Sequence, residues 1–207
     1  MKVLSVEVPA PCPLACAFCR TPDHDQGDAG RVMQATRENL SGYDEVYVTS
    51  NGEPGLSSIF PELISAVHRG GMGLSVLCAT AKSVVPGLSR AEISVNQYTE
   101  PLALRAIEKA HRLDVPVIVS MVDTGETDID LEAVARKHGA EGVLVRGLRA
   151  EGRSHQTGGA TRTYTRPGAN VGLFPVEAYA EVIGHGYATT CINREGAIVA
   201  LLGGRSS

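Results

Sequence analysis

The sequence of 207 residues lacks three features that would place it in large classes of protein. No apolar run approaches the roughly 18–20 residues that a bilayer span requires. The net charge of −4 gives no basic excess, which argues against a protein that wraps nucleic acid or binds membranes through a polybasic surface. The N-terminal stretch is too short and alternates too regularly for a signal peptide. We therefore expect a soluble cytoplasmic protein that binds neither membranes nor nucleic acid.

The sequence also lacks an even, dispersed set of cysteines. It has five, of which Cys12, Cys16 and Cys19 fall within eight residues. A disulfide framework usually spreads an even number of cysteines across a small secreted chain. A tight triplet in a reducing compartment instead indicates a metal ion or an iron–sulfur cluster.

What is present indicates one globular α/β domain over residues 1–207, with a core over about residues 1–147. Hydrophobic residues make up 43% of the chain and charged residues 20%, as in chains that bury an ordinary core. Strands are expected at residues 2–8, 44–49, 73–79, 91–96, 115–122 and 142–146. Helices are expected at residues 31–40, 57–69 and 99–113, and from a capping pattern of Thr127 and Asp130 to Gly139.

These alternations with short connections predict a parallel sheet with right-handed crossovers. They fit an open or closed barrel better than a flat doubly wound sheet. The rhythm breaks in the extension over about residues 148–207, which begins with a polar, glycine-rich stretch. A short helix is expected there over about residues 176–184. Two strand-like runs at residues 188–193 and 197–202 are joined like a hairpin through residues 194–196.

A proline-rich loop, residues 9–19, follows the first expected strand and carries the clustered cysteines in the pattern C-x3-C-x2-C. Three thiolates on one short loop can hold three corners of a cubane cluster and leave the fourth iron open to a non-protein ligand. The prolines stiffen the loop and lower the entropy lost when the ligands are ordered. The alternatives are buried structural thiols and a zinc site, for which His24 is the only nearby fourth ligand.

With Phe18 just before the last cysteine, the loop resembles the C-x3-C-x-aromatic-C signature of the radical S-adenosylmethionine (radical SAM) enzymes. The resemblance implies a partial (β/α)6 barrel, here with a short C-terminal helix and β-hairpin. It implies an oxygen-sensitive [4Fe–4S] cluster on the three cysteines, with Phe18 among the cofactor-binding residues. In that family the reduced cluster cleaves bound S-adenosylmethionine to a 5′-deoxyadenosyl radical, which takes hydrogen from the substrate. An electron donor such as flavodoxin or ferredoxin is then required.

The second expected strand leads into Asn51-Gly52-Glu53-Pro54, which resembles the Gly-Gly-Glu-Pro motif of the same family, with Asn51 in place of the first glycine. Glycine permits close backbone approach, and a carboxylate can bind an ammonium group. The resemblance therefore assigns Asn51, Gly52 and Glu53 to the cofactor site, with Glu53 on the ammonium group of S-adenosylmethionine. The alternative is an ordinary turn before a helix.

Further polar residues lie at the ends of later strands, where active sites of β/α barrels are built. The resemblance makes Ser94, Asn96 and Ser120 candidates for the ribose and carboxylate of S-adenosylmethionine, and Arg146 a candidate for its carboxylate. Ser94, Asn96 and Ser120 could instead form hydrogen bonds with local backbone groups, and Arg146 could form an exposed ion pair.

Two cysteines lie outside the loop. Cys78 is a candidate hydrogen-atom donor if it points into the barrel mouth, as is Cys191, but buried packing is the alternative for both.

The substrate is indicated only by composition. The chain has 15 arginines against 4 lysines, and five of the arginines lie between residues 146 and 166. Guanidinium groups on a glycine-rich loop suit carboxylate or phosphate recognition. We therefore expect Arg149 and Arg153 to lie on a lid over a small anionic metabolite or a cofactor or nucleoside precursor. The alternative is a solvated surface loop.

The subfamily stays open. The segment Cys19-Arg20-Thr21-Pro22-Asp23 resembles both glycyl-radical activating enzymes and 7-carboxy-7-deazaguanine synthases, and neither match extends further. An activating enzyme or peptide modifier that acts on a protein partner is therefore the second reading. A non-catalytic iron–sulfur or zinc-binding module is the third. A homodimer is compatible with each of them.

Overall fold

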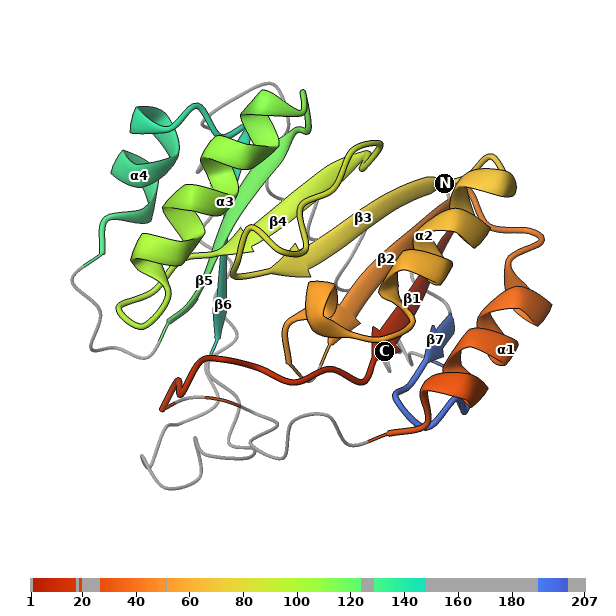
Figure 1. Ribbon diagram of the computed structural model, residues 1–207. Coiled ribbons are helices and arrows are strands. Elements are labelled where there is room, and N and C mark those ends of the chain that lie inside the picture. Colours follow the sequence, from red (N-terminus) through yellow and green to blue (C-terminus); the bar gives the residue numbers. More distant parts are fainter. Residues whose placement is uncertain are drawn as a thin grey trace, which may run out of the picture.

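The computed structural model describes residues 2–17, 19, 27–50, 52–123, 129–147 and 190–200. Its strands are β1 (Val3–Val8), β2 (Glu45–Ser50), β3 (Gly73–Cys78), β4 (Arg90–Ser94), β5 (Val117–Asp123), β6 (Gly142–Gly147), β7 (Thr190–Ile192) and β8 (Ile198–Ala200). Its helices are α1 (Ala29–Asn39), the 3-10 turn η1 (Pro54–Leu56), α2 (Phe60–Arg69), α3 (Glu100–Arg112) and α4 (Leu131–Lys137). From β1 to β6 strands and helices alternate as the sequence predicts, except that β3 and β4 are joined without a helix (Figure 1).

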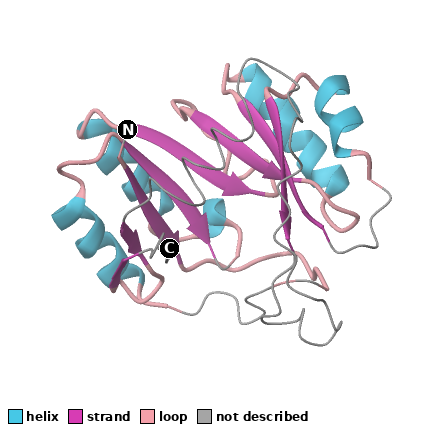
Figure 2. Cartoon of the chain, turned by 180° about the vertical axis from the view of Figure 1, so that it is seen from behind, coloured by secondary structure: helices cyan, strands magenta, loops and turns pink. Residues whose placement is uncertain are grey.

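The strands form one sheet in the order β6-β5-β4-β3-β2-β1-β7-β8. Neighbouring strands from β1 to β6 are parallel, β7 pairs parallel with β1, and β8 pairs antiparallel with β7. The predicted parallel sheet is confirmed, and among the described strands it is open, with β6 and β8 at its ends. Helices α1 to α4 lie in front of the sheet in Figure 1 and behind it in Figure 2, so they cover one face.

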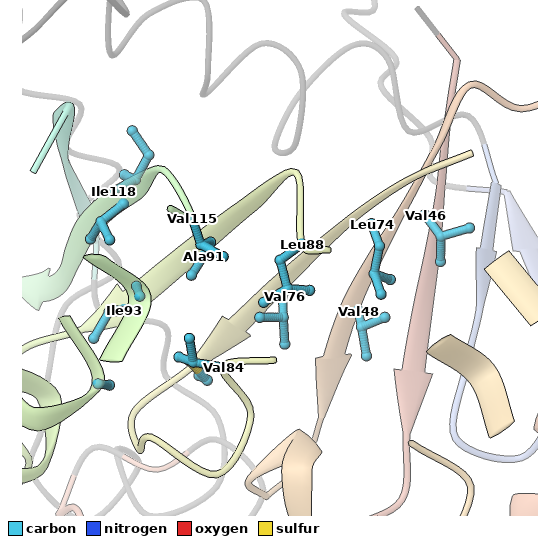
Figure 3. Close-up of a cluster of buried hydrophobic side chains, with 14 of the residues drawn as sticks. Val46, Val48, Leu74, Val76, Val84, Leu88, Ala91, Ile93, Val115 and Ile118 are labelled. Atoms are coloured by element: carbon cyan, nitrogen blue, oxygen red, sulfur yellow. The ribbon is translucent and has the colours of Figure 1, made fainter. Parts of the chain in front are cut away.

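The two faces of the sheet differ because side chains alternate along each strand. Branched aliphatic residues fill the face toward the helices, as the buried cluster around Val48 and Val76 shows (Figure 3). Each large side chain of this kind contributes about 1.5–3 kcal/mol when it leaves water. The opposite face carries polar residues, among them the register pairs Tyr47 with Ser75 and Ser94 with Ser120. A polar site can therefore form on the face that the described helices leave uncovered.

Local caps explain where the helices begin. Helix α1 begins two residues earlier than predicted, because Asp28 caps it and accepts a hydrogen bond from the Arg31 backbone N–H at 2.9 Å. Helix α4 is capped by Asp130, which accepts from the Ala133 N–H at 2.9 Å. Thr127 lies outside the described residues. Helix α2 begins three residues later than predicted, because η1 and a turn come first.

The predicted C-terminal hairpin is confirmed as β7 and β8, joined by a turn in which Gly196 has φ of 75°. Its parallel pairing with β1, from Leu4 with Thr190 to Val6 with Ile192, is a feature that the sequence did not predict. The helix expected over residues 176–184 and the arginine-rich stretch lie outside the described residues. Within the described part of the chain, no helix is long and apolar enough to cross a membrane.

Candidate functional site

The cysteine loop leaves the C-terminal end of β1, as predicted. Cys12, Cys16 and Cys19 are half-buried thiols outside any disulfide, and the Cys19 backbone N–H donates to the Cys16 carbonyl oxygen at 3.2 Å. Among the described residues no three metal-ligating side chains already converge on one point. The donor set itself fits an iron–sulfur cluster, because all three soft thiol ligands lie on one accessible loop. Phe18 lies outside the described residues.

The loop after β2 rests directly on the start of the cysteine loop. The Glu53 backbone N–H donates to the Pro11 carbonyl oxygen at 3.0 Å. A Cβ atom on Gly52 would lie 2.1 Å from the Ala10 carbonyl oxygen and 2.6 Å from that of Pro11. Only glycine allows this approach. The Ser50 hydroxyl adds a second tie, because it donates to Val8 O at 2.8 Å and accepts from the Gly52 N–H at 2.9 Å.

The Glu53 side chain is only 2% exposed and points toward the loop after β3. One carboxylate oxygen accepts from the Ala79 backbone N–H at 3.0 Å, and the other accepts from the Ser83 hydroxyl. Burial raises the pKa of Glu53, and the hydrogen bonds from Ser83, Ala79 and Thr80 oppose that shift. The predicted bond to a ligand ammonium group stays a prediction. Asn51 lies outside the described residues.

Ser83 and Gly55 complete this junction, and sequence reasoning missed both. The Ser83 hydroxyl accepts from the Gly55 backbone N–H at 2.7 Å while it donates to Glu53. A Cβ atom on Gly55 would lie 2.6 Å from the Ser83 backbone nitrogen. The loops after β2 and β3 are therefore fixed to each other. Because the partners are 28 and 30 residues apart, no local pattern could have revealed the contact.

Ser94 and Ser120 lie side by side, because they are register partners on β4 and β5. Ser120 is buried and Ser94 is half-buried. Asn96 is buried in the turn before α3, where its side-chain oxygen accepts from the Tyr98 N–H at 2.9 Å and its N–H donates to the Thr99 hydroxyl. The structure thus brings Ser94 and Ser120 together, whereas the Asn96 side chain closes the turn that precedes α3.

The arginines predicted for this site are not placed. The backbone of Arg146 lies one residue before the end of β6, in register with Val122, but its side chain is outside the described residues, as are Arg149 and Arg153.

The two further cysteines differ in surroundings. Cys78 is buried at the end of β3, in the same hydrophobic cluster as its register partner Ile93. Burial and, to a smaller extent, the nearby carboxylates of Glu53 and Glu92 raise its pKa well above the ordinary value, so it stays protonated. This placement favours buried packing over the hydrogen-donor reading. Cys191 is half-buried on β7, beside Ser5 of β1.

Sequence reasoning also missed a buried polar pair on the face of the sheet opposite the described helices. The Tyr47 hydroxyl on β2 donates to the carboxylate of Glu92 on β4, with 2.9 Å between the oxygens. Glu92 has no exposed surface. The alternation of both strands was a usable signal, because it places these residues on the face opposite the aliphatic side chains that pack on the helices.

No family model and no curated protein matches the sequence. Solved structures do match. SuiB of Streptococcus suis aligns with 80% of this chain and 43% of its own length, at 13% identity and a TM-score of 0.57. SuiB bound to its precursor peptide SuiA also gives 0.57, over 72% of this chain and 40% of SuiB.

TYW1 with a bound lysine–pyruvate adduct matches at 12% identity with a TM-score of 0.50, over 69% of this chain and 64% of TYW1. The chain therefore spans less than half of SuiB and under two thirds of TYW1. SuiB bound to S-adenosylmethionine matches with a TM-score of 0.54 at 13% identity, over 71% of this chain and 39% of SuiB. The likeness shows that this chain has the partial-barrel α/β fold of these structures, as the sequence predicts.

Proposed function

We propose that the protein is a radical SAM enzyme. The observation that carries this proposal is the junction between the cysteine loop and the loop after β2, where Gly52 and Glu53 rest on Pro11. The resemblance assigns these two loops to one cofactor site. Because they are in direct contact at the C-terminal edge of a parallel sheet, one bound group can reach both.

In this proposal Cys12, Cys16 and Cys19 hold a [4Fe–4S] cluster. When bound, the cluster supplies one electron to S-adenosylmethionine and so starts radical chemistry. The protein's own part is to hold the three thiolates on one loop, and to hold that loop against the Gly52–Glu53 backbone. Thiolates are the ligands that iron–sulfur clusters require.

The strand ends supply the groups that would orient S-adenosylmethionine. The adjacent hydroxyls of Ser94 and Ser120 can donate to or accept from its ribose and carboxylate. Glu53 is the group that the resemblance assigns to the ammonium, and because its carboxylate already accepts from Ala79, Thr80 and Ser83, binding there would require one of these bonds to be shared or exchanged. Asn96 and Arg146 complete the proposed set.

For the substrate we propose a small anionic molecule bound by Arg149 and Arg153, with flavodoxin or ferredoxin as the electron donor. A protein or peptide substrate is the second candidate, and one observation favours it: the chain aligns over 72% of its length with SuiB solved on its precursor peptide. Exchange of deuterium between a substrate and 5′-deoxyadenosine would separate the two candidates when anionic metabolites and peptides are tried in turn.

Cluster binding is tested by anaerobic reconstitution of the wild type, Cys16→Ala and the matched control Cys191→Ala, which alters a cysteine outside the loop. We expect about four irons per chain in the wild type and the control, and a large loss in Cys16→Ala. Addition of S-adenosylmethionine should change the electron paramagnetic resonance spectrum of the reduced cluster. A protein that retains a single zinc ion instead would contradict the proposal and favour a zinc-binding module.

A further inference from the structure

The connection from β1 to α1, residues 9–28, begins with the cysteine loop, and the C-terminal hairpin touches the last residues of this connection. The Asp28 backbone N–H, at the N-cap of α1, donates to the Arg194 carbonyl oxygen in the hairpin turn, at 2.8 Å. Figure 1 shows β7 of this hairpin between β1 and α1. The turn of this hairpin therefore contacts the end of the β1–α1 connection, whose first part carries the cysteines.

Two glycines make the contact so close that no side chain fits at either position. A Cβ atom on Gly27 would lie 2.4 Å from the Arg194 carbonyl oxygen. A Cβ atom on Gly196 would lie 2.5 Å from the Cβ of Arg31 and 2.7 Å from its carbonyl carbon. Both glycines have positive φ, of 143° and 75°. The turn and the start of α1 thus pack backbone against backbone.

The hairpin is itself firmly attached to the sheet. Strand β7 pairs with β1, and Ile192 has no exposed surface. The Asn193 side chain accepts from the Glu195 N–H at 3.1 Å and from the Ala197 N–H at 2.9 Å, which orders the turn. The hairpin therefore offers a fixed surface, built on the same strand that leads into the cysteine loop.

We propose that this hairpin is a positioning element for the cysteine loop. It fixes the end of the β1–α1 connection at Gly27 and Asp28, as the Gly52–Glu53 backbone fixes its beginning at Pro11. Fixing both ends lowers the entropy that the loop loses when its thiolates are ordered around a ligand. This inference rests on the proposed function only for what the loop binds; the positioning contact belongs to the protein alone.

The test compares Gly196→Ala with Gly42→Ala. Gly42 also has a positive φ, of 100°, but nothing lies within 4 Å of a Cβ atom there, so the control carries the backbone strain without the contact. After anaerobic reconstitution, cluster loss to an iron chelator is timed at a temperature where circular dichroism shows both variants folded. We expect several-fold faster loss from Gly196→Ala, and loss at the wild-type rate from Gly42→Ala. Equal rates in the two variants would overturn the inference.

A second measurement needs no cluster. Amide hydrogen exchange at Asp28 in the metal-free protein should be slow in the wild type and in Gly42→Ala, and fast in Gly196→Ala. Unchanged protection in Gly196→Ala would overturn the positioning role. If the wild type binds no cluster at all, the proposed function fails, but this exchange result still decides whether the hairpin fixes the end of the loop.

Discussion

The backbone N–H of Glu53 donates a hydrogen bond to the carbonyl oxygen of Pro11, with 3.0 Å between nitrogen and oxygen. This bond joins the two segments that carry the sequence motifs, one after β1 and the other after β2. A group bound by the cysteine loop would therefore lie beside the Gly52–Glu53 backbone, through a contact that the protein forms by itself.

Gly52→Ala should displace the cysteine loop. The added methyl would lie 2.1 Å from the Ala10 carbonyl oxygen, so one of the two loops must move. Overpacking of this kind costs about 1–3 kcal/mol, and we expect a fall of that size in the free energy of unfolding measured with urea. The control is Gly30→Ala in α1, where the nearest atom is 3.4 Å away and helix propensity favours alanine. Equal stability of the two variants would contradict the described junction.

Ser83→Ala should weaken the tie between the loops after β2 and β3. The change removes the acceptor for the Gly55 N–H and a donor to the buried Glu53 carboxylate. Leaving such groups without partners costs about 1–3 kcal/mol. Ser58→Ala, at an exposed position, should change the free energy of unfolding by less than about 0.5 kcal/mol. A Ser83→Ala effect as small as that of the control would show that the network contributes nothing.

The stability difference between wild type and Glu53→Gln should depend on pH. Burial raises the pKa of Glu53 above its ordinary value of 4.5, so the folded state holds this proton more tightly than the unfolded state. The protonated side chain therefore favours folding below about pH 4.5, and this contribution is lost as pH rises through the higher folded-state pKa.

Glutamine does not titrate in this range, so the wild type should lose stability relative to Glu53→Gln as pH rises above about 4.5. Urea denaturation of both proteins between about pH 4 and about pH 8 measures the difference. A difference that stays constant over that range would contradict the raised pKa.

Tyr47→Phe should lower the free energy of unfolding, because Tyr47 donates a hydrogen bond to the buried Glu92 carboxylate. The change removes a phenol donor 2.9 Å from a carboxylate that has no exposed surface, which should cost about 1–3 kcal/mol. Tyr43→Phe is the matched control at a partly buried position and should have little effect on the free energy of unfolding. Similar losses in both variants would point to lost packing rather than to the hydrogen bond.

The sheet and the hairpin were predictable because their signals are local. Alternating apolar residues set the parallel strands, and residues 194–196 mark a turn that is closed by Asn193 and by Gly196 at positive φ. The partner of β7 was not predictable, because a strand of three residues carries too little pattern to select β1 from the other strands. Helix starts shifted by two or three residues where a cap or a 3-10 turn intervened.

In the candidate site too, features with a local sequence signal were predictable and contacts between distant residues were not. The cysteine loop and the glycine and glutamate after β2 were recognisable as motifs, and strand order alone places Ser94 beside Ser120. The direction of the Glu53 side chain was not predictable, because its partner Ser83 lies 30 residues away in the sequence. The sequence could not show which atoms exclude a side chain at Gly52. Only in the folded chain is the Pro11 carbonyl seen to occupy the place of a Cβ atom.

The central claim is that the junction of the two loops serves reductive cleavage of S-adenosylmethionine. The most direct measurement is formation of 5′-deoxyadenosine by the anaerobically reconstituted protein, with dithionite as the reductant and S-adenosylmethionine as the substrate. We predict formation by the wild type and Cys191→Ala, and its loss in Cys16→Ala. A complete, reducible cluster that neither binds nor cleaves S-adenosylmethionine would contradict the claim and leave a non-catalytic iron–sulfur module as the better account.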